Sequence, residues 1–323
     1  MKVTILGAGA YALALSSMAY ENNNEITIWT AFAEEKEALI KYGYSERLPD
    51  YKVPTSFVIN TELKQAVSEA ELIVIAVPTG AVDEVCRLLE PYYEEQQSFC
   101  LASKGIEQGT CRFVSDVFLQ HLHSSNYAVI SGGSFAVDII KKVPIGLSIA
   151  GNNQETIKLI KQALQNKYLK LRETDDVLGV EICGSIKNII AIASGILDGM
   201  GLPESSQAMF ITEALHDIKE LIHALGGSRN TILSFAGFGD ILLTCTSKKS
   251  RNFSFGRLLG QNTPSADIES YKSKTTIEGL YTLESVYKLL NDKTVDMPII
   301  DLIYDIVFNG KNPKELISFL NTK

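Results

Sequence analysis

One lysine in an apolar helical stretch is the residue of this sequence whose chemistry most needs an explanation. Lys187 stands within the run GSIKNIIAI. A buried ammonium group is costly unless it has a counter-ion or a chemical task. A lysine amine in that position can exchange a proton with a substrate oxygen. A long lysine stem can also reach past apolar neighbours into solvent, so this second interpretation stays open.

A carboxylate and a hydroxyl lie four residues apart farther along the chain. Asp240 and Thr244 follow the glycine-rich segment at 237–239, and a helix would place both side chains on one face. Asp240 would serve only as an N-cap in the simpler interpretation. Ser250-Arg251-Asn252 comes shortly afterwards.

Two predicted strands of the first half end in residues that suit an anionic ligand. Lys104 follows one strand, and the turn at 131–136 (SGGSFA) follows another. Ligands of open α/β sheets bind outside the carboxyl ends of the strands, and bare backbone amides suit anionic oxygens. An exposed lysine and an ordinary turn are the alternatives.

The first predicted strand ends in the glycine motif G-x-G-x-x-A. Gly7 permits a tight turn, Gly9 lets the backbone approach a pyrophosphate, and Ala12 is small enough for helix–strand packing. The pyrophosphate would lie at the positive end of the following helix. We expect a dinucleotide coenzyme here, although an unspecialised βα turn would give the same letters.

The type of coenzyme stays open. NAD enzymes usually place Asp or Glu at the end of the second strand, whereas NADP enzymes place Arg there. The segment Trp29-Thr30-Ala31-Phe32 has neither, and Lys36 is expected to be a surface residue. The sequence therefore predicts NAD(H) or NADP(H) without choosing between them.

These residues must be positioned by two different kinds of fold. Strand-like and helical runs alternate through the first half, which predicts βαβ units and a parallel sheet. The expected strands cover residues 3–6, 25–29, 72–77, 99–103, 128–131, 146–150 and 169–172, with helices at 10–20, 33–41, 82–89, 112–122 and 154–164. The remainder reads as helices at 181–200, 208–225, 231–235, 255–259, 279–290 and 299–308. We predict an α/β protein with a Rossmann-like doubly wound domain at 1–176 and an all-α catalytic and substrate domain at 177–323.

Composition excludes several classes of function. The chain has 323 residues and a formal net charge of -8, which disfavours a nucleic-acid or membrane-surface binder. No apolar run is expected to be long enough for a membrane span. Its five cysteines and four histidines show no metal-ligand spacing, so we expect free buried thiols and no metal. No signal-peptide pattern is seen, and we expect a cytoplasmic protein.

Six segments in the same order make the chain similar to the bacterial-type NAD(P)-dependent glycerol-3-phosphate dehydrogenases. They are GAGAYALAL, ASKG, SG-x-SFA, GSIKNIIAIASGILDGMGL, AGFGDILLTCTSKKSRNFSFG and IEG. This resemblance implies hydride transfer between C2 of glycerol 3-phosphate and the nicotinamide, which yields dihydroxyacetone phosphate and feeds glycerophospholipid synthesis. Apolar faces of the helical half also allow a homodimer.

The resemblance implies a role for each matching residue. Lys187 would transfer the proton, oriented by Asp240 and Thr244, with Lys104 beside the same oxygen. Substrate contacts are implied for Lys104, Gly132, Ser134, Asn188, Ser250, Arg251 and Asn252. Coenzyme contacts are implied for Gly7, Gly9, Ala10, Tyr11, Ala12, Ala31, Lys104, Ala136, Arg251, Thr276 and Glu278.

The chain also departs from the family's pattern. Gln207 and Glu213 stand where arginines are usual, and Gly133 stands where proline is usual. These positions lie outside the implied proton-transfer and phosphate residues. Two alternatives remain: a reductase of the same two-domain class for another ketoacid or hydroxyacid, and a non-catalytic nucleotide-binding regulator.

Overall fold

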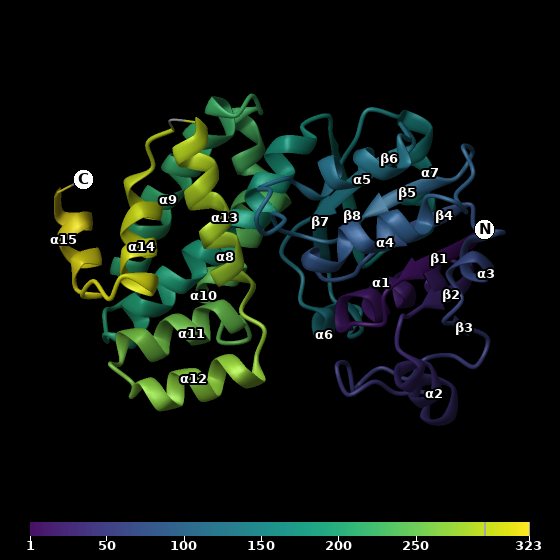
Figure 1. Ribbon diagram of the computed structural model, residues 1–323, viewed down its shortest axis with the longest axis horizontal. Coiled ribbons are helices and arrows are strands. Elements are labelled where there is room, and N and C mark those ends of the chain that lie inside the picture. The colour runs from purple at the N-terminus through teal and green to yellow at the C-terminus, as the bar shows by residue number, and fades with distance from the viewer. Residues whose placement is uncertain (294, 323) are drawn as a thin grey trace. The chain divides into compact units, whose positions relative to one another are not determined.

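The computed structural model describes residues 1–293 and 295–322 (Figure 1). The chain divides into two compact units. Unit 1 comprises Met1–Lys104 and Phe113–Val177, and unit 2 comprises Gly105–Arg112 and Leu178–Lys323. The short segment Gly105–Arg112 therefore groups with the second half of the chain, which its position in the sequence does not suggest.

Unit 1 is built on one eight-stranded sheet with the order β3-β2-β1-β4-β5-β6-β7-β8. The first six positions follow the doubly wound dinucleotide-binding order. The strands are β1 (Lys2–Leu6), β2 (Glu25–Trp29), β3 (Val58–Asn60), β4 (Leu72–Ile75), β5 (Ser98–Leu101), β6 (Tyr127–Ser131), β7 (Ile145–Ala150) and β8 (Leu169–Thr174).

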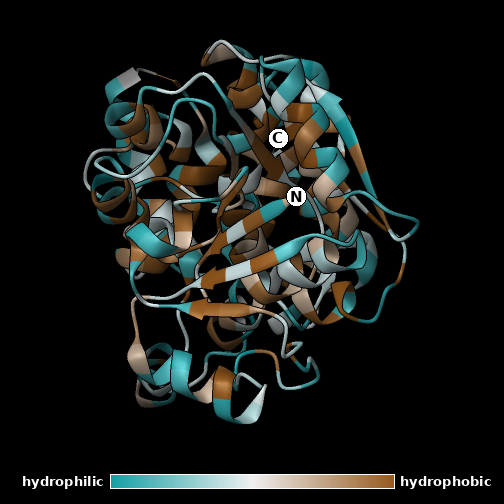
Figure 2. Ribbon diagram, turned by 90° about the vertical axis from the view of Figure 1, so that its right-hand side faces the viewer, coloured by the Kyte–Doolittle hydropathy of each residue, from teal (hydrophilic) through white to brown (hydrophobic). Residues whose placement is uncertain are grey.

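Both faces of this sheet are covered by helices. They are α1 (Ala10–Glu21), α2 (Ala33–Tyr42), α3 (Leu63–Val67), α4 (Val82–Leu89), α5 (Val114–Leu122), α6 (Ala136–Ile139) and α7 (Gln154–Leu164). Helix α1 packs against α6 and α7, whereas α4 packs against α3 and α5. Strands buried on both faces carry near-continuous apolar residues, and Figure 2 shows hydrophobic stretches along them.

The sheet differs from the predicted one in two respects. The sheet is mostly parallel, as predicted, but strand β7 pairs antiparallel with β6. Strand β3 was missed because three edge residues are too few to show a period of two. Helix α5 also begins at Val114, after the residues that belong to unit 2.

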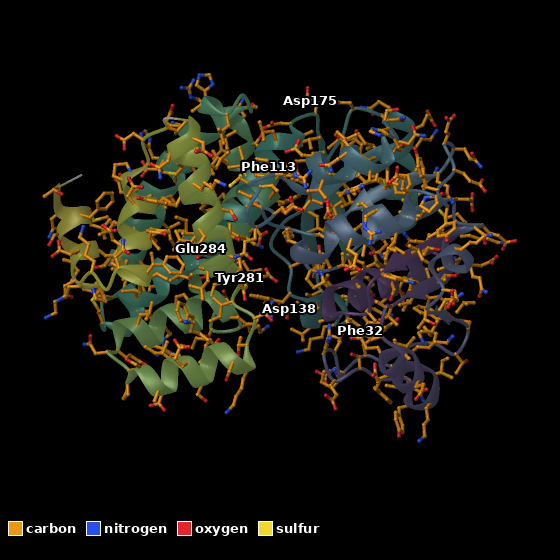
Figure 3. All side chains as sticks on the ribbon, viewed as in Figure 1. Phe32, Phe113, Asp138, Asp175, Tyr281 and Glu284 are labelled. Atoms are coloured by element: carbon orange, nitrogen blue, oxygen red, sulfur yellow. The ribbon has the colours of Figure 1, made fainter. Side chains whose placement is uncertain are left out.

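Unit 2 is a helical assembly. Its helices are α8 (Val177–Gly199, starting at the last residue of unit 1), α9 (Glu204–Ala224), α10 (Asp240–Thr246), α11 (Arg251–Gly260), α12 (Ser265–Lys274), α13 (Glu278–Lys293), α14 (Pro298–Phe308) and α15 (Glu315–Thr322). A short helix was predicted at 231–235, and the structure has a 3₁₀ turn at Arg229–Leu233 instead. Gln108 Nε2 donates to Glu284 Oε2 of α13 at 3.3 Å, which helps to hold Gly105–Arg112 in this unit. Glu284 is labelled in Figure 3.

Helix α8 is longer and more apolar than the sequence interpretation allowed. Its 23 residues are long and apolar enough to cross a membrane, contrary to the expectation that no such run exists. Its apolar stretch is fully buried within the protein, as in the core helix of a globular unit. Its length therefore gives only weak evidence for a membrane span.

Glycines allow α8 and α11 to pack backbone against backbone. Gly195 and Gly199 of α8 face the carbonyl groups of Phe253 and Arg257, and a Cβ at either glycine would overlap those oxygens. Gly256 and Gly260 of α11 meet α8 in the same way. This contact fixes the start of α11 beside the middle of α8, where Lys187 lies.

Candidate active site

Lys187 is paired with a carboxylate inside unit 2. Its Nζ donates to Asp240 Oδ2 at 2.6 Å, and the two side chains are 11% and 2% exposed. Thr244 Oγ1 donates to the Asp240 carbonyl at 2.6 Å and lies 3.3 Å from Asp240 Oδ1. A buried ammonium is tolerated when it has such a counter-ion. The structure therefore brings together the three residues predicted for proton transfer.

A backbone kink before α10 aims Asp240 at the lysine. Gly237 leaves the helical conformation, with φ -83° and ψ -106°. The backbone N–H of Gly237 donates a hydrogen bond to Ser234 Oγ. Gly239 is the N-cap of α10, so Asp240 is the first helical residue. Its side chain is committed to Lys187 and Thr244, contrary to the simpler N-cap interpretation.

Three helices are joined next to Lys187 by amide side chains. Asn252 Nδ2 of α11 donates to Asn188 Oδ1 of α8 at 2.9 Å. Asn252 Oδ1 accepts from the backbone N–H of Gly279 in α13, also at 2.9 Å. Asn188 and Asn252 are 4% and 6% exposed. Both oxygens are thus occupied, which fixes the orientation of the two amides.

The guanidinium of Arg251 lies at the amino end of α11. Ser250 is the N-cap, and its Oγ accepts from the Phe253 backbone N–H at 3.2 Å. Arg251 Nη2 contacts Glu278 Oε1 at 3.2 Å, and Asn188 Nδ2 lies 3.4 Å from Glu278 Oε2. A helix amino end with an arginine beside it suits a phosphate group. Thr276 lies two residues before Glu278.

The glycine turn of unit 1 fits a dinucleotide. Gly7 has φ +118°, and a Cβ there would lie 2.8 Å from the Ala76 carbonyl oxygen. Gly9 is the N-cap of α1 and supplies no side-chain cap, so Ala10, Tyr11 and Ala12 begin the helix next to it. A close backbone approach and helix amides without a side-chain cap are what a pyrophosphate requires.

Lys104 lies beyond the carboxyl end of β5, close to two other predicted residues of unit 1. Its Nζ donates to the Gly132 carbonyl at 2.9 Å and lies 5.6 Å from the centre of the Tyr11 ring. Ser134 Oγ is buried and has no hydrogen-bond partner among the described residues. A buried hydroxyl of this kind is suited to a ligand oxygen. Ala136 opens the short helix α6 two residues later.

The sequence interpretation missed two charged residues near the end of β2. Arg47 Nη2 contacts Glu35 Oε1 at 2.9 Å, and Thr30 Oγ1 donates to Glu35 Oε2 at 2.5 Å. Ala31 and Phe32, which carry neither an acid nor a base, are exposed. Nothing in the sequence signals that Arg47, seventeen positions after Thr30, returns to this place.

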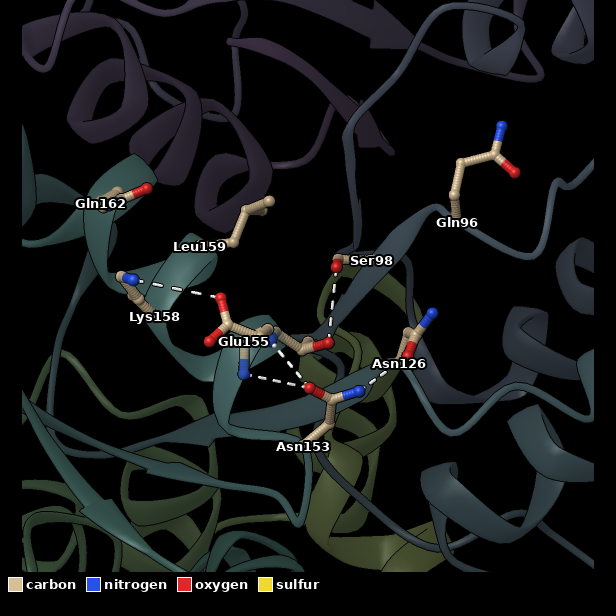
Figure 4. Close-up of a pocket in the computed structure, with 9 residues that line it drawn as sticks. Gln96, Ser98, Asn126, Asn153, Glu155, Lys158, Leu159 and Gln162 are labelled. Atoms are coloured by element: carbon tan, nitrogen blue, oxygen red, sulfur yellow. Dashed lines mark hydrogen bonds and ion pairs between the residues drawn. The ribbon is translucent and has the colours of Figure 1, made fainter.

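A separate polar pocket of about 330 Å³ contains none of the predicted residues (Figure 4). It lies at the amino ends of β5 and β6, opposite to Lys104 and Gly132. Asn153 caps α7 here, and Ser98 Oγ lies 3.4 Å from Thr156 Oγ1. These hydroxyls and amides bond to each other, so the pocket does not point to a ligand.

All five cysteines are free thiols. Cys86, Cys100, Cys183 and Cys245 are buried, and Cys111 is partly buried. Burial raises the pKa of the Cys86, Cys100 and Cys245 thiols. They are therefore unreactive, since the thiolate is the nucleophilic form.

Comparison with known proteins identifies the family. The family described as NAD-dependent glycerol-3-phosphate dehydrogenase matches by its N-terminal part at residues 2–157 and by its C-terminal part at residues 176–318. A glycerol-3-phosphate dehydrogenase (NAD(P)+) of Thermoanaerobacter sp. (strain X514) is 34% identical over 323 residues, covering 100% of this chain and 97% of the relative. A protein of the same name from Staphylococcus aureus is 32% identical, with 99% and 97% covered.

A crystal structure gives the same result for the fold. The glycerol-3-phosphate dehydrogenase of Coxiella burnetii superimposes with a TM-score of 0.92 at 30% sequence identity, covering 100% of this chain and 99% of that one. The matches extend over both units and over the segments that carry Lys104, Lys187 and Arg251. The chain therefore belongs to the NAD-dependent glycerol-3-phosphate dehydrogenase family.

Proposed function

We propose that this protein is an NAD(P)-dependent glycerol-3-phosphate dehydrogenase that interconverts glycerol 3-phosphate and dihydroxyacetone phosphate. The observation that carries the proposal is the buried Lys187–Asp240 pair, with Asn188, Asn252 and Arg251 grouped on the adjoining helices. A bound nicotinamide coenzyme would supply the hydride acceptor or donor for C2 of the substrate. The residues of the chain hold the substrate and move the proton.

Lys187 is the proposed acid–base group. In alcohol oxidation its neutral amine takes the C2 hydroxyl proton, and in ketone reduction its ammonium returns one to the carbonyl oxygen. The positive charge also stabilises the oxyanion that develops at that oxygen. Asp240 holds Nζ in place through its Oδ2, and Thr244 in turn holds the Asp240 carboxylate through Oδ1. Lys104 is proposed to polarise the same oxygen.

The substrate phosphate is assigned to the start of α11. Ser250, Arg251 and Asn252 offer a hydroxyl, a guanidinium and an amide there, and the helix amino end adds its positive potential. Asn188 is proposed to position the substrate next to Lys187. From unit 1, we assign Gly132 and Ser134 to the substrate, supported by the buried Ser134 hydroxyl.

The coenzyme contacts are proposed to come mainly from unit 1. The turn from Gly7 to Ala12 would take the pyrophosphate, and we assign Ala31, which follows β2 in the chain, to the adenosine end. The other assigned residues are Tyr11, Lys104, Ala136, Arg251, Thr276 and Glu278. In functional terms we divide the chain into a dinucleotide-binding part at 1–176 and a catalytic and substrate part at 177–323.

We also propose a cytoplasmic enzyme of glycerophospholipid synthesis that acts as a homodimer. The free thiols support a reducing compartment. Leu233, Phe238 and Leu242 are 78%, 44% and 41% exposed, which favours pairing through unit 2. Sedimentation at micromolar concentration tests this pairing, and a monomer would contradict it.

The experiment that tests the proposed activity is an assay at 340 nm with dihydroxyacetone phosphate, run in parallel with NADH and NADPH. Oxidation of either coenzyme, slowed by about 10²–10⁴-fold in the Lys187→Ala variant, is the expected result. Folded protein that binds a nucleotide but oxidises neither coenzyme would contradict it. Activity on a 2-ketoacid alone would instead establish a reductase for another substrate.

A further inference from the structure

A guanidinium lies beside the glycine turn of unit 1. Arg47 Nη1 is 4.0 Å from the position that a Cβ on Gly9 would occupy. The ion pair with Glu35 uses Nη2 of the same guanidinium, and Glu35 is tied to Thr30 directly after β2. Arg47 therefore links the glycine turn, where the pyrophosphate of a dinucleotide lies, to the end of the second strand, where its adenosine ribose lies.

The loop that carries Arg47 is anchored in the core. Leu48, the next residue, is fully buried, and its backbone N–H donates to the Ser45 carbonyl at 3.0 Å. The Arg47 backbone N–H donates to Ser45 Oγ at 3.2 Å. The backbone beneath the guanidinium is thus held before any ligand binds, which reduces the entropy lost on binding.

Glu35 and Arg47 would select different coenzymes. A carboxylate at this place accepts hydrogen bonds from the ribose hydroxyls of NAD, whereas an arginine binds the 2′-phosphate of NADP. Both Glu35 oxygens already accept hydrogen bonds, and its side chain is only 23% exposed. The Arg47 side chain is 57% exposed and has five N–H donors, so it can hold a phosphate while it keeps the Glu35 contact.

We propose that Arg47 binds the 2′-phosphate of the coenzyme and makes NADP(H) the preferred coenzyme of this protein. The proposal rests on the proposed function for its reaction, and it deepens that function by naming the coenzyme. Glu35 acts as a positioning residue that orients the guanidinium toward the turn. Ala31 and Phe32 are exposed and carry no charge, so they do not repel a phosphate.

Ligand binding tests the proposal independently of the reaction. Adenosine 2′,5′-bisphosphate and adenosine 5′-monophosphate are titrated into the protein by calorimetry. We expect the bisphosphate to bind at least about tenfold more tightly, and Arg47→Leu to abolish this difference while leaving the monophosphate Kd within about twofold. Equal binding of the two nucleotides by the unchanged protein would overturn the proposal.

Steady-state kinetics gives the second readout. In Arg47→Leu, kcat/KM for NADPH is expected to fall by about tenfold or more, with that for NADH within about twofold. Lys36→Ala is the matched control, since it removes the cation that follows Glu35 in α2 and should leave the ratio of the two kcat/KM values unchanged. Equal losses with both coenzymes would place Arg47 at the pyrophosphate and overturn the proposal. The proposal would also be overturned, in favour of NAD, if Glu35→Gln lowered kcat/KM for NADH while Arg47→Leu changed kcat/KM for neither coenzyme.

If neither coenzyme supports reduction of dihydroxyacetone phosphate, the proposed function fails. The calorimetric difference between the two nucleotides would still decide the role of Arg47. The two results therefore separate the coenzyme site from the reaction.

Discussion

The chemistry assigned to this protein depends on the Lys187–Asp240 ion pair, whose side chains are almost fully buried. Asp240 lies 2.6 Å from Lys187 Nζ, and Thr244 contacts the other oxygen of the same carboxylate. Breaking a buried pair by removing one partner typically costs about 3–5 kcal/mol of folding free energy. Variants at these residues therefore require measurements of stability together with activity.

Lys187→Ala should remove most of the turnover. The variant has no group in this place to exchange the C2 hydroxyl proton, so we expect kcat to fall by about 10²–10⁴-fold. Coenzyme affinity, measured by fluorescence titration, should change little. A folded variant with near-normal kcat would exclude Lys187 from proton transfer.

Two threonines of α10 provide a matched pair of variants. Thr244 and Thr246 both donate to the carbonyl four residues earlier, but only Thr244 also reaches the Asp240 carboxylate. We expect Thr244→Val to lower kcat by about three- to tenfold, the equivalent of one hydrogen bond of ~1 kcal/mol. Thr246→Val should leave kcat unchanged, and equal effects of both would contradict the positioning role.

Arg251→Ala should act on substrate binding. Loss of a charged contact to the phosphate costs about 1.5–3 kcal/mol, so KM for dihydroxyacetone phosphate should rise by about 10–100-fold. Dihydroxyacetone, which has no phosphate, is the control substrate, and its kcat/KM should change far less. An unchanged KM for the phosphorylated substrate would place the phosphate elsewhere.

At the scale of elements, the contact between α8 and α11 decides where the substrate residues stand. The glycines allow two helix backbones to meet, which brings the start of α11 to Asn188. Alanine normally stabilises a helix relative to glycine by up to about 1 kcal/mol. In this contact the added methyl group would overlap a carbonyl oxygen instead.

Gly256→Ala should therefore destabilise the protein. A Cβ there overlaps the Ile192 carbonyl oxygen, and overpacking of this kind costs about 1–3 kcal/mol. Gly239→Ala is the control, because its nearest neighbour would be an ordinary contact at 3.8 Å and its φ of -61° is helical. Urea unfolding measures the stability of both variants. Equal unfolding midpoints would show that α8 and α11 can move apart to accept the methyl group without loss of stability.

At the scale of the whole molecule, buried thiols in both units make the free energy of unfolding depend on pH in the alkaline range. Burial raises the pKa of the Cys86 thiol from 9.0 to about 12, and burial also raises those of Cys100 and Cys245. Above pH 9 the unfolded chain releases these protons while the folded protein retains them. The free energy of unfolding therefore falls as pH rises, by about 1.4 kcal/mol per pH unit for each thiol.

Cys86→Ala isolates one of these contributions. Between pH 9 and 10.5 the free energy of unfolding of the variant should fall less steeply than that of the unchanged protein. The expected difference in slope is about 1.4 kcal/mol per pH unit, and below pH 9 the two slopes should agree. Urea titrations at several pH values measure this, and parallel curves throughout would refute it.

The sequence by itself determined the parts that short-range patterns encode. The glycine motif follows β1, and helices α4 and α7 occur as predicted, because periodicity and turn residues act within a few positions. The order of α/β and helical halves followed from the same patterns. The chain's membership of its family rested on six such segments.

Only the tertiary structure decided which distant residues meet. Lys187 and Asp240 are 53 positions apart, and Asn188 and Asn252 are 64 apart, so no local period relates them. The antiparallel pairing of β7 depends on the path of the chain after α6, and the short strand β3 depends on pairing with β2. Arg47 is the clearest example of a contact that local sequence patterns do not predict. A loop anchored through buried Leu48 brings it to the glycine turn. Packing determines such contacts, whereas local sequence determines only the elements that pack.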